Sequence, residues 1–96
     1  MSYELVWSRR ALRRLDEIAS YIAANNPQAA ADVVSRIATA VERLVEHPLS
    51  GRHGRLNNTR ELVLADIPYI IPYRVIGRRV YFITVLHAAQ RWPLKR

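Results

Sequence analysis

The sequence predicts one α+β domain in which a helical hairpin packs on a mainly antiparallel sheet, in the element order βααβββ. Three observations predict it: a short alternating segment at the start, two consecutive stretches with helical periodicity, and three strand-like segments in the second half. The chain has 96 residues, which suits a single hydrophobic core. Residues 1–96 are therefore expected to form one domain.

The first strand is predicted over residues 3–7, which alternate and are rich in residues that favour strands. Ser8 follows as a candidate N-cap, because its hydroxyl can accept a hydrogen bond from a backbone N–H of the first helical turn. Apolar residues then recur at helical spacing: Ala11, Leu15, Ile18 and Ile22. Arg13 and Glu17 are spaced for an ion pair across one helical turn.

A second helix is predicted directly after the first. Asn26 can cap it, and Pro27 stands at the first helical position, where its missing N–H costs nothing. Its apolar stripe is Ala30, Val33, Val34, Ile37, Val41, Leu44 and Val45. His47 and Pro48 end it. Two amphipathic helices joined by so short a turn are expected to form an antiparallel hairpin.

Residues 48–59 have the composition of a loop, with two glycines and two asparagines that interrupt any periodicity. The segment is longer than most connections in compact domains, and such loops are often functional. Its Arg52, His53 and Arg55 are expected to place positive charge on a flexible basic loop.

Three strands are predicted to complete the chain, over residues 60–64, 68–76 and 79–87. Gly77 and Arg78 make a tight turn between the last two, which should form a hairpin.

The positive charge is concentrated in the second half of the chain. The formal net charge is +7, yet residues 1–48 hold six arginines and six acids. Residues 49–96 hold eight arginines and Lys95 against Glu61 and Asp66. This asymmetry indicates either an ordinary basic surface or a face that meets a polyanion or an acidic partner.

Several classes of protein and site are disfavoured. The chain has no cysteine, which excludes disulfides and thiolate metal sites and fits a cytoplasmic location. No apolar run is long enough for a membrane span. His47, His53 and His87 lie in three separate settings, so no metal or other cofactor is expected. The remaining arginines, histidines and aromatic residues suit either acid–base chemistry on RNA or binding without reaction.

Taken in order, several segments resemble the RelE/ParE superfamily of type II toxin–antitoxin toxins, and most closely its ParE branch, often called plasmid stabilisation proteins. The matching segments are WSxxAxxxLxxIAxYI at 7–22, NPxAA at 26–30, IxxxVxxLxxxPxxGR at 37–52, REL at 60–62, PYIIPYRV at 68–75 and VLHAAQxW at 85–92. The resemblance implies the same βααβββ fold.

The resemblance also bears on catalysis. RelE-type members cleave mRNA on the ribosome with basic residues on the sheet, and here those positions hold Glu61, Val63 and Ile70. Glu61 would be expected to repel RNA. A ParE-like role instead implies inhibition of DNA gyrase without catalysis, so no catalytic residue is assigned. The resemblance also implies neutralisation by a ParD-like antitoxin with an acidic C-terminal segment.

The residues expected to contact the target or the antitoxin are Arg60, Arg74, His87, Arg91 and Trp92. Alternation along the strand places Arg74 on the face opposite Tyr73, where it is exposed or pairs with Asp66. Two alternatives to the gyrase inhibitor remain. One is a RelE-like mRNA endonuclease with a rearranged site around His87, and the other is an inactive or differently targeted module of the same fold.

Overall fold

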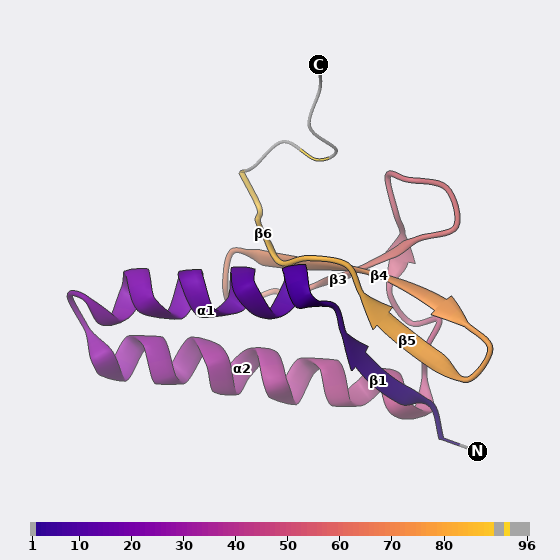
Figure 1. Ribbon diagram of the computed structural model, residues 1–96, viewed down its shortest axis with the longest axis horizontal. Coiled ribbons are helices and arrows are strands. Elements are labelled where there is room, and N and C mark those ends of the chain that lie inside the picture. The colour runs from indigo at the N-terminus through magenta and orange to yellow at the C-terminus, as the bar shows by residue number, and fades with distance from the viewer. Residues whose placement is uncertain (1, 90–91, 93–96) are drawn as a thin grey trace.

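The computed structural model describes residues 2–89 and 92, and shows two antiparallel helices packed along one face of a twisted sheet (Figure 1). The elements are β1 Glu4–Trp7, α1 Arg9–Ala23, α2 Pro27–Glu46, β2 Arg52–His53, β3 Arg60–Val63, β4 Tyr69–Ile76, β5 Arg79–Phe82 and β6 Leu86–His87. The predicted α+β class, with a helical hairpin on a mainly antiparallel sheet, is confirmed.

The sheet is mixed, with the strand order β1-β5-β4-β3-β2 and with β6 paired to β4. Only the β1–β5 pair is parallel; the other pairs between described strands are antiparallel. The first strand of the chain therefore pairs with the fifth and is an edge strand of the sheet. At this edge α1 begins directly after β1 (Figure 1).

Both helices begin at the predicted caps. Ser8 Oγ accepts a hydrogen bond from the Ala11 N–H at 2.9 Å, and its hydroxyl donates to the Ile83 carbonyl at 3.0 Å. Asn26 Oδ1 accepts from the Ala29 N–H at 3.1 Å, with Pro27 as the first residue of α2. Ser8 thus does more than cap α1, because it also attaches the helix to the chain beyond β5.

The predicted pair between Arg13 and Glu17 is wrong. Arg14 Nη1 bonds Glu17 Oε1 at 3.0 Å instead, and Arg14 Nε donates to the Val85 carbonyl at 3.3 Å. Arg14 is half-buried against the segment before β6, while Arg13 points to solvent. A contact across the fold therefore decides which arginine pairs with Glu17.

The core lies between the helices and the facing side of the sheet. Its buried members are Ala11, Ile18, Ile37, Val41, Leu44, Leu62, Leu64, Ile71, Tyr73, Val80, Phe82 and Val85. Phe82 is the aromatic centre, with its ring centroid 4.4 Å from that of Trp7 and 6.4 Å from that of Tyr73. Neither helix in the described chain has the length and hydropathy of a membrane span.

Two predicted boundaries need correction. The segment 48–59 is not loop throughout, because Arg52 and His53 form β2 against β3. The strand expected over 79–87 divides into β5 and β6. Thr84, Val85 and Leu86 are all buried, which a strand with one solvent face cannot achieve, since its side chains alternate between faces. The chain therefore leaves the ladder after Phe82 and rejoins it at Leu86.

We expect Ser8→Ala to lower the free energy of unfolding by about 1–2 kcal/mol, because it removes a helix cap and the bond to Ile83. Urea denaturation followed by circular dichroism measures this loss. Ser20→Ala, on the exposed side of α1, is the matched control and should change stability by less than about 0.5 kcal/mol. Equal midpoints for the two variants would contradict the role given to Ser8.

Candidate functional site

A buried carboxylate organises the face of the sheet that is turned away from the helices. Glu61 is opposite Pro72 on β4 and Arg52 on β2. Its neighbour Leu62 points into the core, so Glu61 points to the other face. Its side chain is nevertheless fully buried, because the segment that follows α2 folds over it.

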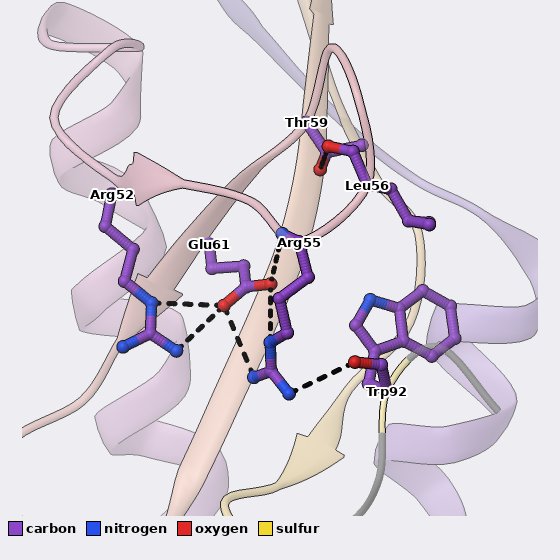
Figure 2. A network of polar contacts seen from close by, with 6 residues as sticks. All are labelled: Arg52, Arg55, Leu56, Thr59, Glu61 and Trp92. Atoms are coloured by element: carbon purple, nitrogen blue, oxygen red, sulfur yellow. Dashed lines mark hydrogen bonds and ion pairs between the residues drawn. The ribbon is translucent and has the colours of Figure 1, made fainter. Parts of the chain in front are cut away.

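Two arginines from that segment satisfy both carboxylate oxygens (Figure 2). Glu61 Oε1 accepts from Arg52 Nε at 3.1 Å and Nη2 at 2.8 Å, and from Arg55 Nη2 at 3.4 Å. Glu61 Oε2 accepts from the Arg55 backbone N–H at 3.1 Å and from Arg55 Nε at 3.2 Å. Forked pairs of this kind are among the stronger charge-assisted hydrogen bonds.

These contacts determine the ionisation of Glu61. Burial on its own raises the pKa of the carboxyl group, but the hydrogen bonds from Arg52 and Arg55 outweigh it and hold the pKa below its ordinary value of 4.5. The carboxylate is therefore charged at neutral pH, and two guanidinium groups face one negative charge. The negative charge on which the expected repulsion of RNA by Glu61 depends is thus more than balanced by the two arginines.

The start of the same segment is held by Tyr73. The Tyr73 hydroxyl donates to the Pro48 carbonyl at 2.7 Å and accepts from the Gly51 N–H at 2.9 Å. Burial raises the pKa of Tyr73. A Cβ at residue 51 would lie 2.6 Å from the Tyr73 hydroxyl and 2.9 Å from the Glu61 carbonyl oxygen, so only glycine fits at this position.

Arg60 also holds the start of the segment that follows α2. Its Nη1 donates to the Leu49 carbonyl at 3.1 Å and to the Gly51 carbonyl at 2.9 Å. Further along, Thr59 Oγ1 donates to the Leu56 carbonyl at 2.6 Å, and the Gly54 N–H donates to the Thr59 carbonyl at 2.8 Å. The predicted basic loop is thus a fixed structure, in which Arg52 and Arg55 are bound and exposed His53 belongs to β2.

The segment also reaches the C-terminal part of the chain. Arg55 Nη1 donates to the Trp92 carbonyl at 3.3 Å, and the Arg10 guanidinium lies 5.8 Å from the centroid of the Trp92 ring. Trp92 is therefore placed between α1 and the arginines that surround Glu61 (Figure 2). Sequence reasoning did not anticipate that Arg10 and Arg55 would meet at this residue.

His87 is exposed at the end of β6. Its ring stands edge-on to Tyr69, with centroids 5.6 Å apart, and its Nδ1 accepts from the Ala89 N–H at 3.1 Å. Nδ1 of His87 is therefore engaged by the backbone.

The structure does not gather the expected contact residues on one surface. Arg60 is opposite Tyr73 and Arg74 is opposite Tyr81, which places the two arginines on different faces of the sheet. Arg91 lies outside the described residues. Asp66 pairs with Arg36 at 2.7 Å, so Arg74 is not its partner.

The role of Glu61 as an anchor was missed. The available signal was a single acid within an apolar strand that follows two arginines. Val63 and Ile70, by contrast, lie directly opposite each other on the open face. Val63 is 44% exposed, so hydrocarbon occupies part of this face.

The chain matches the family model described as the ParE toxin of the type II toxin–antitoxin system parDE, over residues 5–92. It is 66% identical over 87 residues to the "Putative toxin Y4kP" of Sinorhizobium fredii, covering 91% of this chain and 90% of that one. It is 38% identical to Toxin RelE2 of Caulobacter vibrioides, covering 91% and 97%. Its structure resembles that of the chromosomal ParDE system of P. aeruginosa, with a TM-score of 0.80, 27% identity and coverage of 88% and 95%.

The ion pairs of Glu61 predict a pH-dependent stability. The pKa of Glu61 is lowered on folding. The ionised carboxylate therefore adds fully to the free energy of unfolding above the pKa of Glu61 in the unfolded chain, and this addition is lost as the pH falls through the pKa in the folded chain. At pH 7 we expect Glu61→Gln to be less stable than the original chain by about 1–3 kcal/mol. The difference should shrink from about pH 4.5 downward.

Urea denaturation at a series of pH values between 3 and 7 measures this difference. Glu42→Gln, on the exposed side of α2, removes the same charge without a buried ion pair and should cost less than about 0.5 kcal/mol. A cost for Glu61→Gln that is constant over the whole pH range would contradict the role of the ionised carboxylate.

Proposed function

The chain belongs to the ParE toxin family of type II toxin–antitoxin systems, within the RelE/ParE superfamily, and from this premise we propose that it inhibits DNA gyrase by binding and catalyses no reaction. In this proposal the toxin stabilises gyrase on cleaved DNA and so halts replication in the cytoplasm. A cognate ParD-like antitoxin neutralises it.

The proposal rests on the chemistry of the sheet face that is turned away from the helices. RNA cleavage needs a group that moves a proton and cations that stabilise the developing phosphate charge. Here Val63 presents hydrocarbon, Ile70 opposite it is buried, and the arginines nearest Glu61 are engaged in its ion pairs. This arrangement supports a toxin that acts as a binding protein.

The setting of His87 supports the same conclusion. A general base must keep a basic nitrogen available for the substrate proton. Nδ1 of His87 accepts the Ala89 N–H, and the ring packs edge-on to Tyr69. These contacts favour a structural role for the imidazole at the end of β6.

The family and the basic composition support an acidic antitoxin segment as the partner. Short acidic chains that fold on binding can cover a large basic surface. Apolar docking is the competing mode, and the hairpin offers a groove for it. That groove is lined by small and apolar residues: Ala19, Ser20, Ala23, Ala30, Ala31, Val34 and Ser35.

We expect the purified toxin to inhibit supercoiling by gyrase and to increase the amount of linear, cleaved plasmid, because a ParE-type inhibitor holds the enzyme on broken DNA. A supercoiling assay with a titration of toxin measures both effects. An unaffected gyrase, together with mRNA cut at the ribosomal A site, would replace the proposal by the RelE-like activity.

His87→Gln serves as the matched variant in that assay. Glutamine keeps hydrogen-bonding capacity but cannot transfer a proton near neutrality, so this variant should still inhibit gyrase and arrest growth. Its melting temperature must be recorded in parallel. A folded His87→Gln protein that has lost all toxicity would show that the imidazole is chemically required.

We expect the affinity of the antitoxin to fall as salt rises, because screening weakens contacts between its acids and the arginines. Calorimetric titration at 50, 150 and 500 mM salt measures this trend. A dissociation constant that does not change with salt would indicate that apolar docking along the helical hairpin dominates instead.

A further inference from the structure

One part of the surface carries three arginines that form no ion pair within the described chain. Arg9, Arg10 and Arg13 lie in the first turns of α1 and are all exposed. Among the ion pairs of the described chain, Glu17 takes Arg14, and none joins a carboxylate to these three. The only other acid close by on α1 is Asp16, one turn further along.

The position of these arginines is unfavourable for the helix itself. The first turn of α1 holds no acidic residue, although acids stabilise a helix start and cations destabilise it. Arg9 and Arg13 are also four residues apart, a spacing at which like charges repel each other. The same chain would be more stable with acids here, so the arrangement points to an anion supplied from outside.

Two further residues extend this surface. The Arg10 guanidinium stacks near the Trp92 ring at 5.8 Å, and Arg55 Nη1 donates to the Trp92 carbonyl at 3.3 Å. Arg55 is itself paired with Glu61, so its part in this surface is to hold Trp92. We call the set Arg9, Arg10, Arg13, Arg55 and Trp92 the arginine surface.

We propose that the arginine surface binds the phosphate backbone of duplex DNA without regard to sequence. Arg9 and Arg13 are separated along the helix by about 6 Å, one turn, and can contact different phosphates of one strand. Guanidinium groups bind phosphate oxygens in a forked geometry that lysine cannot match. This binding goes beyond the proposed action on gyrase and does not depend on it.

Duplex DNA fits this surface better than an acidic peptide. A peptide that folds on binding needs apolar anchors as well as charge. Two apolar grooves of the described surface lie elsewhere, one near Ala23 and Val34 and the other near Leu49 and Val75. A phosphate backbone needs only cations at suitable intervals.

The test measures fluorescence anisotropy of a labelled 20-base-pair duplex with the full-length toxin, in the absence of gyrase, across a series of salt concentrations. We expect Arg9→Gln/Arg13→Gln to bind more weakly and to reduce the slope of log K against log salt by about 2. Its melting temperature should stay level or rise, because the removed charges oppose the helix.

The control is Arg43→Gln/Arg78→Gln, which removes two positive charges from the last turn of α2 and the β4–β5 turn. It should leave the slope within about half a unit of the original. An equal loss of affinity for the duplex in both variants would show that net charge alone causes the effect, and would overturn the proposal. Loss of affinity only for an acidic antitoxin peptide, or tighter binding of single-stranded RNA than of duplex DNA, would also overturn it.

The outcome separates this proposal from the action on gyrase. A toxin that inhibits gyrase but binds no duplex DNA would overturn only the inference about the arginine surface. A toxin that binds duplex DNA through α1 but leaves gyrase active would overturn only the proposed function.

Discussion

The ion pairs of Glu61 are the interaction on which the outer face of the sheet depends. A buried carboxylate is costly unless its charge is paired and its oxygens are hydrogen-bonded. Here Arg52 and Arg55 meet both conditions, and Arg55 also contributes its backbone N–H. The guanidinium groups remain partly exposed, so only the carboxylate is fully removed from water. One carboxylate thus orders the segment after α2 and, through Arg55, positions Trp92.

A second anchor acts from the core side of the sheet. The Tyr73 hydroxyl donates to the Pro48 carbonyl and accepts from the Gly51 N–H, and Arg60 donates to the Leu49 and Gly51 carbonyls. Because Tyr73 and Glu61 point to opposite faces, the connecting segment is fastened to both faces of the sheet edge. This explains why a dozen residues without helix or long strand keep one shape, and why the arginines there are structural first.

The difference between arginines bound within the fold and arginines exposed on the surface bears on what the toxin can do. The outer face combines a buried, neutralised carboxylate with exposed hydrocarbon at Val63, and Ile70 opposite Val63 is buried. Three exposed arginines lie in the first turns of α1, and one of them, Arg10, lies 5.8 Å from the centroid of the Trp92 ring. In this ParE-family protein the arginines that hold the chain's own segments together are thus distinct from those exposed at the start of α1.

The sequence by itself determined the elements that depend on neighbours within a few residues. Ser8 and Asn26 cap their helices, the apolar stripes define the hairpin, and local periodicity predicts a strand, two helices and the strands that contain β3, β4 and β5. The tertiary structure decided the contacts between distant residues. Glu61 gains its arginines only when β2 pairs with β3, Arg14 rather than Arg13 takes Glu17 because Val85 lies beside it, and β5 and β6 separate because Thr84, Val85 and Leu86 are all buried. Each of these outcomes rests on the packing of segments far apart in the chain, and local spacing carries no information about that packing.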